Sequence, residues 1–212
     1  MAKQKHGING PLSGKIGPVV AASWKGIPVL RARPSKSKSK KGSPKQIAQQ
    51  KRFAMAAKLV QPFAELFPIC FETGVGEGYK NQAMRFLLRT SIYGVYPKLA
   101  VDYSTVTLSR GSLPKAVGAQ VSSTSKGQVK FSWNDNSHMG SASVKDQVIL
   151  IIYSEELKEA QFSVSSGTRK DKKAMLKNNY FSGKKVHTWI SFLASNKKDA
   201  ADSVYTGVIR VK

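Results

Sequence analysis

The residues that carry most of the chemistry in this sequence are lysines and arginines, and they are concentrated near the N-terminus. The chain has 212 residues, with 35 Lys or Arg against 12 Asp or Glu and a net charge of +23. Residues 1–64 contain 14 of these cations and no acidic residue. Cations at such density gain affinity for a polyanion by releasing its condensed counterions. We expect the polyanion contacts to come from Lys15, Lys25, Arg31, Arg33, Lys36, Lys38, Lys40, Lys41, Lys51 and Arg52.

Trp24 adds an aromatic ring to this basic region, directly before Lys25. A ring beside cations suits stacking on the bases of single-stranded nucleic acid. The same tryptophan is also compatible with packing inside a hairpin or with docking on another protein. Signatures of helix-turn-helix, zinc-finger, RNP and KH modules are absent from the sequence, so we expect backbone contacts without base readout.

Residues suited to catalysis or metal binding are few and scattered. His6, His138 and His187 lie far apart in the sequence, and none has a metal-ligand spacing to a cysteine or carboxylate. Asp135, Asn136 and His138 could together hold a cation, but the segment lacks the oxygen periodicity of a calcium loop, and a hairpin turn accounts for it. We therefore predict no metal and no cofactor.

Two further motifs that can carry chemistry have simpler interpretations. The segment GVGEGYK (Gly74 to Lys80) matches neither the dinucleotide-binding nor the Walker spacing, which favours a connection between helices. Cys70, the single cysteine, lies in the apolar segment PICF and is expected to be a buried, unreactive thiol. No G-x-S-x-G nucleophile motif occurs. We predict that the protein is not an enzyme.

The first four of the expected polyanion contacts, Lys15, Lys25, Arg31 and Arg33, are expected to lie on a glycine-rich β-hairpin arm covering residues 1–34. The apolar runs VVAASW and IPVLR flank Lys25-Gly26, a plausible tight turn. Pro18 and Pro28 each remove a backbone donor, which favours edge strands. A two-stranded ribbon is marginal alone, so it must lie on the rest of the chain or on a partner. Residues 35–42 then form a lysine–serine linker.

A small helical module is predicted for residues 43–98. Ser43 supplies an N-cap, Pro44 the first helical position and Gln46 the third position of a capping box, so a helix should run to about Gln61. A second helix is expected over residues 63–71 and a third over 81–93. The side chains expected to face inward are Phe53, Ala56, Ala57 and Val60 in the first helix and Met84, Leu87, Leu88 and Ile92 in the third.

From residue 99 to 212 the hydrophobic period changes to two. Seven strand-like segments occur, namely LAVDYSTVTLS, GQVKFSWN, VKDQVILIIYS, EAQFSVSS, KKAMLK, KVHTWISFLAS and SVYTGVIRVK. Val129, Phe131 and Trp133 alternate inward, and in the sixth segment His187, Trp189 and Leu193 lie opposite the face of Val186, Thr188, Ile190 and Phe192. This predicts an antiparallel fibronectin type III or immunoglobulin-like β-sandwich, and the lack of a cysteine pair favours the fibronectin type. The fold class is therefore α+β.

The sequence predicts a soluble cytoplasmic protein. Gly17, Pro18 and Lys25 interrupt the apolar part of the N-terminus, so no secretory segment is evident. The most apolar run, VILIIY (Val148 to Tyr153), is too short to span a membrane. A single cysteine allows no intrachain disulfide, which fits a reducing compartment.

Several motifs together resemble a family of uncharacterised bacterial proteins over nearly the full length of the chain. They are GINGPLSGKIGPVV (Gly7 to Val20), SWKG (Ser23 to Gly26), RARP (Arg31 to Pro34), QIAQQKRF (Gln46 to Phe53), FSWNDN (Phe131 to Asn136) and SVYTG (Ser203 to Gly207). That family has no assigned activity, so the resemblance transfers no site residue. A weaker resemblance, through Trp24-Lys25-Gly26, Arg31 to Pro34 and Gln49 to Phe53, is to phage-encoded proteins of structural role, although the linker here is richer in lysine.

Two hypotheses of function follow from the sequence. The first is a non-enzymatic, strongly basic protein whose N-terminal third binds nucleic acid or another polyanion without base specificity. The second is a structural or assembly protein of phage type, in which residues 7–34 dock on another protein or on a second copy and the β-sandwich is displayed. Steep salt dependence of binding would favour the first hypothesis.

Overall fold

The structure, a computed structural model, describes residues 2–3, 12–34, 42–71 and 78–212. The chain divides into two compact units, Met1–Ser43 and Pro44–Lys212. Each unit is described by itself below. The predicted contacts Lys36, Lys38, Lys40 and Lys41 lie outside the described residues, as does most of the GVGEGYK segment.

The N-terminal unit is an antiparallel sheet of strands β1 (Ala2–Lys3), β2 (Gly14–Ile16), β3 (Val19–Trp24) and β4 (Ile27–Ala32), in the order β1-β4-β3-β2. The predicted hairpin around Lys25-Gly26 is confirmed. Both turn residues have positive φ, 52° for Lys25 and 78° for Gly26. Positive φ at both positions is the geometry of a two-residue turn whose twist matches that of the paired strands.

The prediction that β3 and β4 are edge strands is wrong, because each has a neighbour on both sides. The two prolines are tolerated for local reasons. Pro18 precedes β3 in the turn after β2. Pro28 lies opposite Ser23, one position from the turn. In a two-residue hairpin this is a non-hydrogen-bonded pair, so the missing N–H of Pro28 is not needed by β3.

The second unit opens with the predicted helix, α1 (Pro44–Val60), which continues into the 3₁₀ turn η1 (Gln61–Phe63). Ala56, Leu59 and Val60 are its buried residues. Phe53, predicted to face inward, is 50% exposed. Its neighbour Arg52 instead lies on the inward stripe, four residues before Ala56, where it makes hydrogen bonds described below.

Two further helices follow, α2 (Phe67–Cys70) and α3 (Tyr79–Thr90). The third helix was predicted to end at residue 93, but α3 ends at Thr90. Ile92 instead opens the hairpin of β5 (Ile92–Val95) and β6 (Lys98–Val101). Gly94 has φ of 90°, and a Cβ there would lie 2.2 Å from the Lys98 carbonyl oxygen. The hairpin therefore requires a glycine at residue 94. Because β5 begins at Ile92, α3 ends at Thr90 instead of continuing to residue 93.

The sandwich consists of seven strands in two sheets, and six of the seven correspond to predicted segments. One sheet has the order β11-β8-β7, with β7 at Val117–Ser122, β8 at Gln128–Asn134 and β11 at Lys173–Lys177. The other has the order β10-β9-β12-β13, with β9 at Gln147–Ser154, β10 at Glu159–Ser163, β12 at Lys185–Leu193 and β13 at Val204–Arg210. All pairings are antiparallel.

The first predicted strand was wrong, because LAVDYSTVTLS forms β6 and the 3₁₀ turn η2 (Tyr103–Thr105). The strand that fills its place, β7, was not predicted. Its sequence VGAQVS is short and polar, Gly118 has a positive φ, and its pairing with β8 shifts register between Val117 and Gln120. Such an irregularity hides the alternation on which strand prediction depends. Two more 3₁₀ turns, η3 (Arg169–Asp171) and η4 (Asn179–Phe181), join the later strands.

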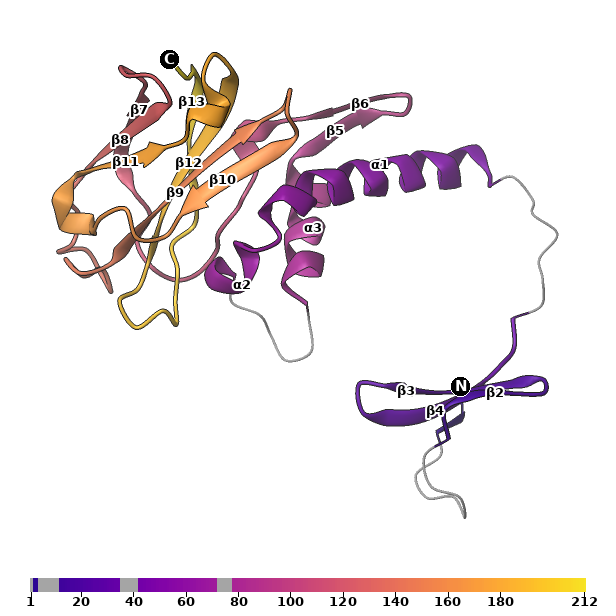
Figure 1. Cartoon of the computed structure of the whole chain (residues 1–212). Helices are drawn as coiled ribbons and strands as arrows, with labels where there is room; N and C mark the ends of the chain where they lie inside the picture. Colours follow the sequence, from indigo (N-terminus) through magenta and orange to yellow (C-terminus); the bar gives the residue numbers. More distant parts are fainter. Residues whose placement is uncertain (1, 4–11, 35–41, 72–77) are drawn as a thin grey trace. The chain divides into compact units, whose positions relative to one another are not determined.

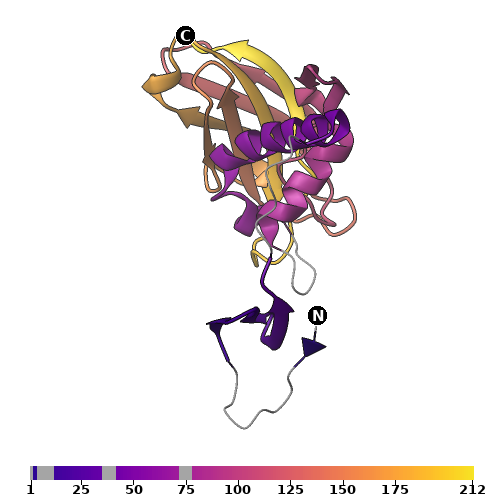
Figure 2. The same ribbon diagram turned by 90° about the vertical axis from the view of Figure 1, so that its right-hand side faces the viewer.

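The four-stranded sheet is buried on both faces, and this arrangement unites the second unit. One face, with Leu150, Ile190 and Phe192, packs against Phe131 and other residues of the three-stranded sheet. The opposite face packs against the helices through Ile149, Ile151, Tyr153, Trp189 and Leu193, which contact a cluster containing Leu59, Phe63, Phe67 and Leu87. Both views show the helices on one side of this sheet (Figure 1, Figure 2). Double burial explains why VILIIY has no polar alternation.

Candidate functional site

Four predicted binding residues lie on one face of the N-terminal sheet. The register places Lys15 opposite Val20 and Val20 opposite Arg31, so Lys15 and Arg31 point to the same side. Because side chains alternate along a strand, Arg33 and Trp24 share that side. We call Lys15, Trp24, Arg31 and Arg33 the basic face. All four side chains are exposed, Trp24 at 62%.

Lys25 extends this surface at the hairpin turn. Its Nζ lies 5.3 Å from the centroid of the Trp24 ring, within cation–π range. The ring is therefore held next to a positive charge while most of its surface stays accessible. An aromatic surface bordered by cations is what stacking of a nucleic-acid base requires.

The opposite face of the same sheet carries no charge in strands β2 to β4. Its residues, which alternate with those of the basic face, are Gly14, Ile16, Val19, Ala21, Ser23, Pro28, Leu30 and Ala32. Ile16 is 53% exposed, whereas Ala21 is buried. We call this set the uncharged face. The sheet is thus chemically two-sided.

The remaining two predicted contacts, Lys51 and Arg52, belong to α1 in the second unit, and only one of them is free to meet a ligand. Arg52 donates from Nη2 to the carbonyl oxygens of Leu88 and Ile92, both at 2.7 Å. Leu88 belongs to the last turn of α3, whose carbonyls have no helical partner and attract cations. Arg52 thus joins α1 to the end of α3. Lys51 is exposed.

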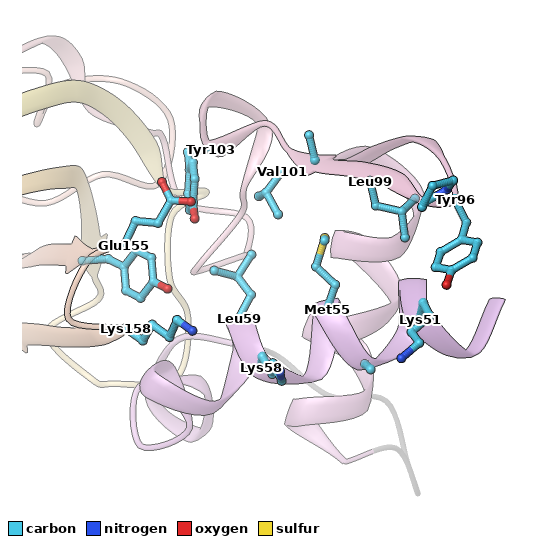
Figure 3. Close-up of a pocket in the computed structure, with 14 residues that line it drawn as sticks. Lys51, Met55, Lys58, Leu59, Tyr96, Leu99, Val101, Tyr103, Glu155 and Lys158 are labelled. Carbon is cyan, nitrogen blue, oxygen red and sulfur yellow. The ribbon is translucent and has the colours of Figure 1, made fainter. Parts of the chain in front are cut away.

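Lys51 lines a groove of about 810 Å³ that the sequence did not predict (Figure 3). The groove lies along α1 and is bounded by the β5–β6 hairpin, η2 and the β9–β10 turn. Its apolar lining consists of Ala54, Met55, Leu59, Tyr96, Pro97, Leu99, Ala100, Val101, Tyr103 and Tyr153. Its charged lining consists of Lys51, Lys58, Lys158 and Glu155. The sequence feature that could have indicated this groove is the spacing of Lys51, Met55 and Lys58, which places the three side chains on one side of a helix.

At one end of the groove, aromatic rings pack around His187. The ring of Tyr103 stacks on His187 with centroids 3.8 Å apart, and His187 Nδ1 lies 2.9 Å from the Tyr205 hydroxyl. Burial lowers the pKa of His187, although Glu155 acts in the opposite direction. Burial also raises the pKa of Tyr103, with a further contribution from Tyr153. The Tyr103 ring lines the groove at this end, and its stacking on His187 holds it in place.

The segment around Asp135, Asn136 and His138 has a structural role. Asn136 is buried, donates to the Lys115 carbonyl oxygen at 2.9 Å and accepts a 2.6 Å hydrogen bond from Arg169. Arg169 is itself fully buried and pairs with the Asp146 carboxylate at 3.1 Å. These contacts bind the loop after β8 to η3. Within the described ranges, no cluster of three or more His, Cys, Asp or Glu side chains could hold a metal ion.

The other candidates from the sequence have ordinary environments. Cys70 is buried, as predicted, and burial raises the pKa of its thiol to about 12. His138 is exposed, and His6 lies outside the described residues. In the part of the chain that the structure describes, every helix is too short or too polar to cross a bilayer.

Comparison with known proteins identifies a family and shows a structural likeness. A solved structure of the fibronectin type III domain of the human collagen alpha-1(XX) chain is 11% identical, with a TM-score of 0.37, over 49% of this chain and 90% of that one. No curated protein matches the sequence. A family model matches residues 10–207, nearly the full length. The chain therefore belongs to DUF6266, a family of unknown function.

Proposed function

We propose that the protein is a non-enzymatic binding protein that engages a polyanion, nucleic acid in the first place, through the basic face. The observation that carries the proposal is the register of β2, β3 and β4, which puts Lys15, Arg31 and Arg33 on the side of the exposed Trp24 ring. Lys15 lies on β2 and Arg31 on β4, with β3 between them, so their backbones are about 10 Å apart at the usual strand spacing.

Charge and shape both support a backbone-binding mode. The basic face meets no carboxylate from its own unit, because the first acidic residue of the chain is Glu65. Each phosphate contact should release about 0.7 to 0.9 of a counterion, depending on strandedness. Contacts from these cations to the phosphate backbone carry no sequence information, so binding should depend little on base sequence.

The test is a gel-shift titration of random single-stranded and double-stranded oligonucleotides at several salt concentrations. The triple variant Lys15→Gln, Arg31→Gln, Arg33→Gln should reduce the slope of log affinity against log salt by about 2 to 3. Trp24→Ala should weaken single-strand binding by about 1 to 3 kcal/mol while leaving the slope unchanged.

A matched control removes three cations from an exposed strand face in the other unit, namely Lys130→Gln, Lys173→Gln, Lys177→Gln. This control should leave the slope near that of the parent chain. Equal slopes for the two triple variants would mean that net charge alone drives binding, and the proposal would be wrong. No shift at micromolar protein and about 50 mM salt would also contradict it.

The uncharged face favours a second candidate function, assembly with another copy of the chain. Among the described residues of the N-terminal unit, only Ala21 and Val29 are buried hydrophobic side chains. So small a core rarely stabilises a unit of this size without a partner. High salt should screen the repulsion between basic copies and promote association through Ile16 and Val19.

Sedimentation of the full chain at about 50 and 500 mM salt tests this candidate. A larger mass at high salt that is lost in Val19→Asp, but kept in the basic-face triple variant, would support assembly. A monomer under both conditions would exclude self-assembly through this face.

A further inference from the structure

We propose that the groove along α1 is a docking site for an acidic, amphipathic helical peptide segment of a partner protein. The site belongs to the second unit and is separate from the basic face. The inference does not depend on polyanion binding by the N-terminal sheet.

The floor of the groove is apolar and accessible. Met55 and Leu59, one helical turn apart on α1, point toward Leu99 and Val101 of β6 (Figure 3). Met55, Leu99 and Val101 are only half-buried, so part of their surface is left for a ligand. Tyr103 closes one end, where its stacking on His187 holds the ring in place. A row of apolar side chains between two walls is the kind of surface that receives the apolar face of a helix.

Lysines at the rim determine the sign of the ligand. Lys51 and Lys58 are exposed on α1 and lie seven residues apart, which is two helical turns or about 10.5 Å. Lys158, in the β9–β10 turn, adds a third positive charge, and Glu155 is the one acid in the lining. A ligand that fills the groove therefore meets a net positive rim. Its flanks should carry carboxylates, spaced over at least two helical turns.

This distribution of charge and apolar surface favours a peptide over a small anion or a nucleic acid. A small anion needs converging cations, whereas Lys51 and Lys58 are spread along the helix. Stacking of single-stranded bases needs free ring faces. Tyr103 is already stacked, Tyr153 is 5% exposed, and Tyr96 at the outer end is the one accessible ring of the lining. A helix with leucines at every third or fourth position and glutamates beside them satisfies both the floor and the rim.

The experiment uses the full chain and a fluorescein-labelled 16-residue helical peptide with such a leucine stripe flanked by glutamates. Fluorescence anisotropy should show saturable binding. Lys51→Glu, Lys58→Glu should weaken binding about tenfold or more, since it replaces attraction by repulsion at two rim positions. Val101→Asp should weaken it by a similar factor by making the floor polar. A peptide of the same leucine stripe with lysines replacing the glutamates should bind at least tenfold more weakly.

Matched controls separate this site from general charge effects. Lys173→Glu, Lys177→Glu reverses two exposed cations on β11 and should leave peptide affinity within about twofold. The basic-face triple variant should also leave it unchanged, so failure of the groove and failure of the basic face can be told apart. Because charge reversal could disturb folding, the methyl NMR signal of Met55 in the parent chain provides a second readout. The peptide should shift Met55 and leave the exposed Met175 in place.

Three results would overturn the proposal. The first is absence of binding up to about 1 mM peptide. The second is equal affinity for the glutamate and lysine peptides, which would show that the rim lysines do not select charge. The third is displacement of the peptide by a single-stranded oligonucleotide, together with loss of that oligonucleotide's binding in the variant Lys51→Glu, Lys58→Glu. This result would make the groove a nucleic-acid site.

Discussion

The two units of this protein represent opposite ways of making a β-sheet. The N-terminal sheet has four short strands, and among its described residues only Ala21 and Val29 are buried hydrophobics. The sheet β10-β9-β12-β13 of the second unit is covered on both faces, by the second sheet on one side and by the helices on the other. The first is held by a tight turn and backbone pairing. The second is held by burial of large side chains.

The comparison also extends to charge. Every acidic residue of the chain follows residue 64, so internal ion pairs are available to the second unit alone. There, Arg169 is fully buried because Asp146, Asn136 and the Pro114 carbonyl oxygen satisfy its guanidinium. In the N-terminal unit, Lys15, Arg31 and Arg33 are exposed, and that unit contains no acidic residue that could pair with them. Large buried side chains are thus concentrated in the second unit, whereas the first unit has no acidic residue to pair with its cations.

Removing the partner of the buried arginine should have the largest effect. Asp146→Ala leaves the Arg169 guanidinium buried without its counter-charge and should lower the free energy of unfolding of the second unit by about 3 to 5 kcal/mol. Urea unfolding followed by tryptophan fluorescence measures the loss. As a control, Glu156→Ala removes an exposed partner of Lys184 and should cost less than about 1 kcal/mol. A loss below about 1 kcal/mol for Asp146→Ala would contradict this prediction, because it would show that water solvates the Arg169 guanidinium when the carboxylate is removed.

An intermediate effect is expected at Arg52, the one described N-terminal cation with a structural role. Arg52→Met keeps the apolar stem but leaves the Leu88 and Ile92 carbonyls without their donor. It should lower the free energy of unfolding by about 1.5 to 3 kcal/mol in the same urea assay. Lys51→Met, its exposed neighbour, should change stability by less than about 0.5 kcal/mol. If Arg52→Met instead reduced the salt slope of nucleic-acid binding without a change in stability, Arg52 would be a ligand contact.

Disrupting the N-terminal sheet should have the smallest effect on the stability of the second unit. Val29→Asp places a charge at one of its two buried positions and should disorder that unit, as seen in the environment of Trp24. The second unit should not respond. Cys70, whose pKa is raised to about 12 by burial, reports on it, because the thiol should stay unreactive to a disulfide reagent near pH 8. Rapid labelling of Cys70 in Val29→Asp would instead show that the two units fold together.

Local signals in the sequence were reliable where one residue decides the geometry. Lys25-Gly26 indicated the turn of the first hairpin, and Ser43-Pro44 indicated the start of α1; both are confirmed. The alternation of Val129, Phe131 and Trp133 indicated a sandwich strand, and all three are buried. Predictions failed where a contact with a residue distant in the sequence determines the orientation of a side chain. Phe53 is more apolar than Arg52, yet Arg52 faces inward because the end of α3 supplies carbonyl oxygens for its guanidinium.

The candidate sites divide in the same way. Lys15, Arg31 and Arg33 were named from the charge density of the N-terminal third, and their binding role stays a prediction. That they share one face became visible only from the strand register. The groove was not found, because its walls come from α1, the β5–β6 hairpin and the β9–β10 turn. Lys51 and Lys158 are more than 100 residues apart, and nothing in the local pattern of either one indicates the other.

The amino-acid sequence by itself determined the charge imbalance, the positions of most helices and strands, and membership of the family, because these depend on composition and short-range periodicity. The tertiary structure decided which cations remain free, that the four-stranded sheet is covered by helices, and where a groove opens between the helix and the hairpin. These outcomes depend on which surfaces meet across long sequence separations. Burial and hydrogen bonding at such contacts change the role of a residue without changing its local sequence.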